Sequence, residues 1–186
     1  MASGSKRRIE LMTEITKNFK VSPADINEEI EYENPFMLTL NLAKQKADFV
    51  FLKNQNSLVI GADTIVCLGG VVFNKPRDEK QAVEFIKTLS GKTHAVITAV
   101  CFRTKNLQIS VLDKTDVTFN NLTDLQAEQY VEVFKPLDKS GAYGIQDKFN
   151  HIKSYDGDIY TVIGFPVKKV KFILENFFKI PDYIKR

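Results

Sequence analysis

The chain has 186 residues, a length that fits one domain, or two closely packed lobes, with a core that needs neither disulfides nor a structural metal. Apolar residues make up 44% and charged residues 26%, which is ordinary for a globular protein and excludes a disordered chain. With 26 basic and 23 acidic residues, the net charge of +3 is too small to indicate a general nucleic-acid or membrane surface.

Targeting signals and cysteine usage point to an ordinary intracellular protein. The apolar runs are far shorter than the roughly 20 residues of a membrane span, and the first residues lack the apolar stretch of a secretory signal. Cys67 and Cys101 lie in apolar surroundings without metal-ligand spacing, and we interpret them as small thiols in a reducing compartment. We therefore expect a soluble, cytoplasmic protein.

The first half of the chain predicts helices around one buried strand. Apolar residues at helical spacing over 5–20 predict a helix that begins directly after Ser5, and a second helix opens at Pro35 after a polar loop. The apolar run 57–62 predicts a buried strand ending at Asp63. A third helix is predicted by three local signals, an N-cap, a glutamine three residues later and a C-terminal glycine: Asp78, Gln81 and Gly91.

The second half predicts two long strands and two further helices. Strands over 93–103 and 107–119 are joined by a turn and must be antiparallel neighbours. A capping box predicts a helix from Thr123 to Pro136, and a glycine-punctuated loop follows. Residues 159–164 predict a short strand before a final helix. We expect one α/β domain over residues 1–186, with a mixed, partly antiparallel sheet flanked by helices.

A basic cluster opens the first helix. Lys6, Arg7 and Arg8 occupy its first turn, where the helix dipole favours acidic residues, and the small residues Ser3 to Ser5 precede them. Exposed backbone N–H groups, a helix N-terminus and two guanidinium groups make a suitable phosphate site. The alternative is a solvated basic start to a surface helix.

Asp63, Lys75 and one acidic segment offer chemistry that a phosphate substrate needs. Asp63, placed at a strand end, is suited to activating water or holding a divalent cation, or else it only stabilises a turn. Lys75, before a proline, either contacts a phosphate or faces solvent in its turn. Four glutamates are either a solvated acidic segment or a source of one Mg²⁺ ligand: Glu28, Glu29, Glu31 and Glu33.

Gln146 follows the glycine-punctuated loop. Its amide offers a donor beside an acceptor, which complements the edge of uracil or thymine, but the same amide is also suited to completing a backbone turn. His94 and His151 have no evident cysteine or carboxylate partner in the sequence, and we interpret both as structural.

Seven sequence blocks resemble, in order, those of the Maf family of nucleotide pyrophosphatases. The blocks lie at 2–11, 42–47, 61–66, 74–76, 89–100, 138–146 and 156–166. The resemblance implies an elongated α/β fold with two lobes around a nucleotide cleft, shared with inosine-triphosphatase-like enzymes. It implies hydrolysis of a nucleoside triphosphate between the α and β phosphates, and it indicates the branch that prefers dTTP and UTP over 7-methyl-GTP.

The resemblance also implies roles for individual residues. Asp63 matches the residue that activates water, and Arg7, Thr64 and Gln146 match positions that set substrate choice. Lys46 and Lys75 match phosphate-facing lysines, and Glu28 matches an acidic position near a Mg²⁺ or Mn²⁺ ion. We expect Arg7 and Arg8, with Ser3 in the same loop, to add to the binding of the triphosphate. The sequence departs from the family pattern at Lys6, which stands where proline is usual.

Partners and rival functions follow from the same residues. We expect a small-molecule nucleotide as substrate, with no nucleic acid and no membrane, and the family allows a homodimer. A rival hypothesis is a non-enzymatic, nucleotide-binding regulator of cell division, since the family is linked by name to septum formation. A nucleic-acid binder is disfavoured by the small net charge and the lack of aromatic residues among the basic ones.

Overall fold

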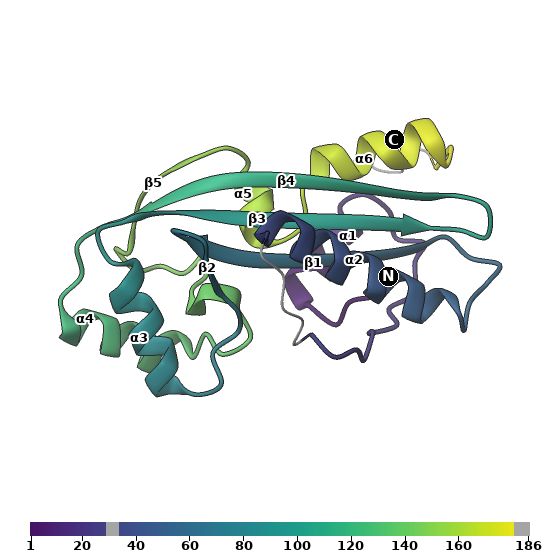
Figure 1. Cartoon of the computed structure of the whole chain (residues 1–186). Coiled ribbons are helices and arrows are strands. Elements are labelled where there is room, and N and C mark those ends of the chain that lie inside the picture. Colours follow the sequence, from purple (N-terminus) through teal and green to yellow (C-terminus); the bar gives the residue numbers. More distant parts are fainter. Residues whose placement is uncertain (29–33, 181–186) are drawn as a thin grey trace. The chain divides into compact units, whose positions relative to one another are not determined.

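The computed structural model describes residues 1–28 and 34–180 (Figure 1). Of the four candidate glutamates, Glu29, Glu31 and Glu33 lie outside the described residues. The elements in chain order are α1 (Lys6–Thr13), α2 (Pro35–Phe51), β1 (Val59–Leu68), β2 (Val71–Phe73), α3 (Glu79–Leu89), β3 (Thr93–Arg103), β4 (Gln108–Phe119), α4 (Asp124–Phe134), a 3₁₀ turn (Ser140–Ala142), β5 (Ile152–Asp156), α5 (Ile159–Ile163) and α6 (Val167–Phe177).

The five strands form one sheet in the order β2-β1-β3-β4-β5. β1 pairs antiparallel with β2, with Val66 opposite Phe73, and β4 pairs antiparallel with β5, with Val117 opposite Tyr155. β3 and β4 are neighbours joined by a tight turn, in which Thr104 N donates to Leu107 O at 2.8 Å. The expected α/β class, with a partly antiparallel sheet flanked by helices, is confirmed.

The chain divides into two compact units. The first comprises Met1–Asp63, Thr98–Asp113 and Gly164–Arg186, and the second comprises Thr64–Ile97 and Lys114–Ile163. In the first unit, small residues let α2 pack closely on the sheet; its buried cluster is Ala2, Ala43, Ala47, Val50, Phe51, Val59, Ala99 and Cys101. Both cysteines are free thiols, and burial raises the pKa of Cys101.

The core of the second unit is rich in aromatic side chains. α3 and α4 contribute Ile86, Leu89 and the wholly buried Tyr130, which pack with Phe119 of β4 and with Tyr143. Both histidines of the chain are buried in this unit. His94 Nε2 lies 2.8 Å from Tyr143 Oη, and burial lowers the pKa of His94 to about 4. Both histidines therefore pack as part of this core, as expected for side chains with a structural role.

Local capping signals set the ends of two helices as predicted. The Asp78 side chain accepts from Gln81 N at 2.7 Å at the start of α3, and Thr123 forms a reciprocal capping box with Gln126 at the start of α4. Gly91 follows α3 with a φ of 68°, a conformation that glycine adopts without strain.

The predicted strand at 159–164 is wrong, because residues 159–163 form the short helix α5. Asp158 starts this helix, since its carboxylate accepts from Tyr160 N at 3.0 Å and its carbonyl from Thr161 N at 3.0 Å. The strand lies earlier, as β5, which sequence analysis missed. β5 is a largely exposed edge strand, so it lacks the apolar alternation of a half-buried strand.

α1 begins directly after Ser5 as predicted but ends at Thr13, well before residue 20. Thr13 Oγ1 donates to Ile9 O at 2.8 Å, and Ile15 N donates to Met12 O at 3.0 Å, which closes the helix with a tight turn. Ile15 is still buried, so its apolar character reflects packing outside a helix. Over the described part of the chain, no helix is long and apolar enough to cross a bilayer.

Candidate active site

Asp63 lies in the middle of β1, so its predicted place at the end of a strand is wrong. The strand continues through Thr64 to Leu68, because this stretch consists of β-branched and apolar residues that favour an extended chain. Only 5% of Asp63 is exposed. A carboxylate at such a position requires a cationic or hydrogen-bonding partner, since burying an isolated charge is costly.

A close contact between α2 and β1 brings that partner to Asp63. A Cβ on Gly61 would lie 2.4 Å from Ala43 O and 2.6 Å from Ala47 N, both backbone atoms of α2. Only glycine allows the helix backbone to approach the strand this closely. Lys46 precedes Ala47 on α2, and Gly61 precedes Asp63 by two residues, so the contact places the lysine beside the aspartate.

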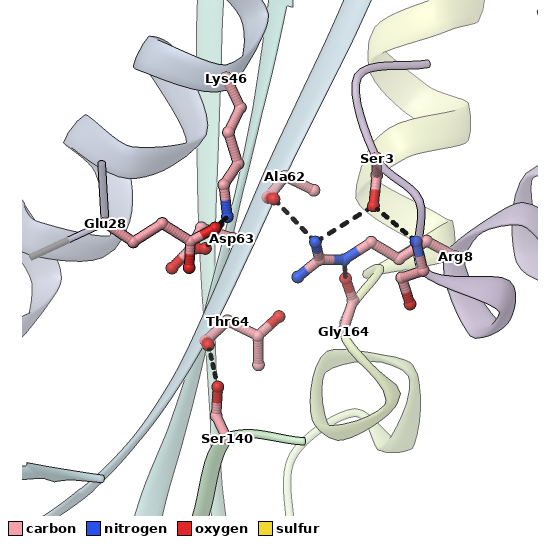
Figure 2. Close-up of polar contacts among 10 residues, drawn as sticks. Ser3, Arg8, Glu28, Lys46, Ala62, Asp63, Thr64, Ser140 and Gly164 are labelled. Atoms are coloured by element: carbon pink, nitrogen blue, oxygen red, sulfur yellow. Dashed lines mark hydrogen bonds and ion pairs between the residues drawn. The ribbon is translucent and has the colours of Figure 1, made fainter. Parts of the chain in front are cut away.

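Lys46 joins two carboxylates (Figure 2). Its Nζ lies 2.6 Å from Asp63 Oδ1 and 2.8 Å from Glu28 Oε1. The side chains of Lys46 and Asp63 are each 8% exposed, whereas that of Glu28 is 42% exposed. The structure therefore brings together three of the predicted residues, in an arrangement of one ammonium between a buried and a partly accessible carboxylate.

Arg8 binds backbone atoms of its own unit. Its Nε donates to Gly164 O at 2.9 Å, and its Nη1 donates to Ala62 O at 2.8 Å and to Ser3 Oγ at 3.4 Å (Figure 2). Ser3 Oγ also accepts from Ser5 N at 3.3 Å. Burial lowers the pKa of Arg8, and the carboxylate of Asp63 opposes this shift. Arg8 and Ser3 thus hold the loop before α1 against the residue that precedes Asp63.

The remaining predicted residues are placed by different elements. Arg7 is half-buried on α1, next to Arg8. In the second unit, Thr64 O accepts from Ser140 Oγ at 2.8 Å, and Gly141 N donates to Asn74 O at 3.2 Å, next to the exposed Lys75. Gln146 is exposed in the loop that continues from Gly141.

The donor set of Glu28 and Asp63 fits a hard divalent cation. Among residues 1–28 and 34–180, no cluster of three or more acidic, histidine or cysteine side chains could hold a metal ion by itself. Mg²⁺, however, is commonly held by one or two carboxylates together with substrate phosphates. Glu28 and Asp63 direct one oxygen each toward the Lys46 ammonium, so two carboxylates already converge on a cation.

Sequence analysis missed two structural contributors, one in each compact unit. Gly61 carries no chemistry, and only its place in an otherwise apolar strand signals a close backbone contact. Asp147 directly follows Gln146 and accepts a hydrogen bond from Tyr130 of α4. The two residues are 17 positions apart, so no local sequence pattern predicts this contact.

Comparison with known proteins identifies the family. The sequence model of the Maf-like protein family matches residues 1–177. The chain belongs to the Maf-like protein family. The match covers every described element and all the site residues above, so the predicted resemblance is confirmed.

Relatives named dTTP/UTP pyrophosphatase are similar to the chain over nearly their whole length. A dTTP/UTP pyrophosphatase of Bacillus pumilus is 38% identical over 179 residues, which is 95% of each chain. The dTTP/UTP pyrophosphatase of Aquifex aeolicus is 39% identical over 177 residues, covering 95% of this chain and 93% of the relative. That of Thermosipho africanus is 40% identical over 175 residues, covering 94% and 90%.

Proposed function

We propose that this chain hydrolyses dTTP and UTP to the nucleoside monophosphate and pyrophosphate. Relatives named for this activity match about 95% of the chain. The observation that carries the proposal is the buried Asp63 carboxylate, held 2.6 Å from the Lys46 ammonium at a point where further cations lie nearby. A water-activating base beside positive charge is what attack on a polyphosphate needs.

The reaction follows from these groups. A water oxygen attacks the α phosphorus, the bond from that phosphorus to the bridging oxygen of the β phosphate breaks, and pyrophosphate leaves. Asp63 takes the proton that the water loses, as general base. Lys46 and Arg7 neutralise the triphosphate, and Lys75 of the second unit adds a further cation. Arg8 fixes the loop and strand backbone around Asp63.

A divalent cation completes the charge balance in this proposal. Glu28 and Asp63 would hold it, and it would supply Lewis-acid stabilisation of the phosphate oxygens. Substrate choice is assigned to Arg7, Thr64 and Gln146, with the Gln146 amide facing the edge of uracil or thymine.

A nucleotide panel in ¹⁸O-labelled water tests the proposal. With Mg²⁺ or Mn²⁺, dTTP and UTP should yield pyrophosphate, and the label should appear in the monophosphate because water attacks the α phosphorus. Label in orthophosphate would place the attack at the γ phosphorus and contradict it. Tight nucleotide binding without turnover of any triphosphate would instead support a regulator.

A further inference from the structure

Gln146 occupies the centre of a tight turn in the second unit. Asp147 N donates to Gly144 O at 3.1 Å, which makes Ile145 and Gln146 the two central residues of the turn. Gln146 is exposed at this position. The direction of its amide therefore depends on how firmly Gly144 and Asp147, the two ends of the turn, are held.

A buried tyrosine holds both ends at once. Tyr130 of α4 is wholly buried, and its hydroxyl donates to Asp147 Oδ2. Gly144 N lies 2.9 Å from Tyr130 Oη and 3.1 Å from Asp147 Oδ2, so it donates to both oxygens. Burial, reinforced by the Asp147 carboxylate, raises the pKa of Tyr130, which keeps the hydroxyl proton in place to donate.

A buried histidine holds the same turn from its other side. His151 Nε2 lies 3.0 Å from Gly144 O, and His151 Nδ1 lies 3.0 Å from Phe149 O. Carbonyl oxygens only accept, and a neutral imidazole donates through one nitrogen, so the two contacts compete for one proton. Burial lowers the pKa of His151, while both carbonyls and the Asp147 charge oppose the shift.

Close aromatic packing restricts the rotation of the Tyr130 and His151 side chains. The His151 ring centroid lies 4.8 Å from that of Tyr130 and 6.0 Å from that of Tyr143. Tyr143 is also kept protonated, since burial raises its pKa. Rigid packing around the side chains that hold the turn transmits that rigidity to the turn itself.

We propose that Tyr130 and His151 are positioning residues for Gln146, which set base discrimination by fixing the Gly144–Asp147 turn. The inference rests on the proposed function, in which Gln146 reads a uracil or thymine edge. A site built to hydrogen-bond a base rejects other bases only when its polar groups stay in place. Neither positioning residue touches the substrate in this proposal.

The test compares kcat/KM for UTP and for GTP in Tyr130→Phe, which removes only the hydroxyl. The UTP:GTP preference should fall about tenfold, chiefly through a higher KM for UTP, because one hydrogen bond that orients the turn is lost. In a Gln146→Ala background, Tyr130→Phe should cause no further loss of preference. Equal losses for UTP and GTP, or full additivity in the double variant, would overturn the inference.

His151 provides a matched pair of variants. His151→Gln keeps an N–H donor near the Nε2 position and should retain the preference, whereas His151→Leu removes every donor and should lose it. Tyr155→Phe, at a tyrosine that is 46% exposed on β5, serves as the neutral control. If both His151 variants behave alike, the hydrogen bond to Gly144 has no role in positioning.

Hydrogen exchange separates this inference from the proposed function. Without nucleotide, the amides of Gly144 and Asp147 should exchange faster in Tyr130→Phe than in the wild type, whatever the substrate is. Failure of the proposed function shows first in the wild type, as absence of UTP turnover. Unchanged exchange at these two amides contradicts the inference even where the wild type is active.

Discussion

Lys46 Nζ lies 2.6 Å from Asp63 Oδ1, and both side chains are almost completely buried. The lysine side chain comes from α2 and the aspartate from the middle of β1, and the backbone contact at Gly61 sets their separation. Asp63, the proposed base, is thus held in an ion pair with Lys46. If Asp63 is the base proposed above, a triphosphate that enters meets a lysine already beside it.

Replacement of Asp63 by asparagine should abolish turnover while the fold and nucleotide binding persist. The amide is similar in size but cannot take a proton from water. Rates in the pyrophosphate assay should fall by about a thousandfold or more, with nucleotide affinity measured by calorimetry. Asp48→Asn is the matched control, because Asp48 pairs with Arg103 at 3.3 Å elsewhere in the same unit. A near-wild-type rate for Asp63→Asn would refute the assignment.

Replacement of Lys46 by methionine should destabilise the protein by about 3 kcal/mol, because the buried Asp63 loses its cation while Glu28 remains close. Urea unfolding measures this loss. Mn²⁺ should raise the midpoint of thermal unfolding more in the variant than in the wild type, since the ion can then lie between the two carboxylates. The metal assignment fails if Mn²⁺ stabilises neither protein.

The adjacent arginines should respond differently to substitution. Arg8→Lys should cost about 2 kcal/mol of stability, because one ammonium cannot replace a guanidinium that donates to both Ala62 O and Gly164 O. Arg7→Ala should leave stability less affected and raise the KM for UTP about tenfold. Urea unfolding and steady-state kinetics of both variants measure these effects. A larger loss of stability in Arg7→Ala, with a larger rise in KM in Arg8→Lys, would contradict the assignment of Arg8 to structure and Arg7 to substrate binding.

A methyl group at Gly61 should separate α2 from β1. The added Cβ would meet backbone atoms of Ala43 and Ala47, which have no rotamer to yield, so Gly61→Ala should cost about 3 kcal/mol. Gly4→Ala is a mild control, since its Cβ would meet Pro23 Cγ at an ordinary 3.5 Å. Thermal unfolding of the two variants measures the difference, and equal midpoints would contradict the close contact.

Acid should weaken the fold through His94. Burial lowers the pKa of His94 to about 4 from 6.5, so the unfolded chain alone takes up this proton between those values. Stability should therefore fall by about 1.4 kcal/mol per pH unit, or about 3 kcal/mol in all, as pH falls through this window, with no effect above it.

His94→Gln removes this titration and keeps an acceptor for the Tyr143 hydroxyl. Urea unfolding at about pH 7 and about pH 5 should show a smaller acid loss in the variant than in the wild type. His151, whose pKa is also lowered, contributes in the same direction in both proteins, so some loss should remain. Identical losses would show that His94 is not protonated on unfolding in this range.

Local sequence signals predicted the elements whose ends depend on neighbouring residues. The ends of α3 depend on residues within or next to the helix, namely Asp78, Gln81 and Gly91. They could therefore be predicted without knowledge of the tertiary structure. β5 was missed because an exposed edge strand needs no apolar pattern, and its stability comes from pairing with β4.

The candidate site was predictable as a set of residues but not as an arrangement. The spacing of Lys46 and Asp63 along the chain says nothing of the contact between them, which depends on the packing of a helix on a strand. Arg8 has the sequence signature of a phosphate ligand, yet its Nε and Nη1 donate within the protein. Only the tertiary structure shows that a guanidinium group donates hydrogen bonds to backbone carbonyl oxygens, as that of Arg8 does.

The aromatic core of the second unit supplies a built-in optical reporter. The chain has no tryptophan and six tyrosines, two of which, Tyr130 and Tyr143, are buried there with hydroxyls bonded to Asp147 and His94. Tyrosine emission, which tryptophan would otherwise mask, is therefore open to direct measurement. A carboxylate acceptor quenches phenol fluorescence. Opening of the Tyr130–Asp147 hydrogen bond should therefore raise the tyrosine fluorescence intensity of the unlabelled protein.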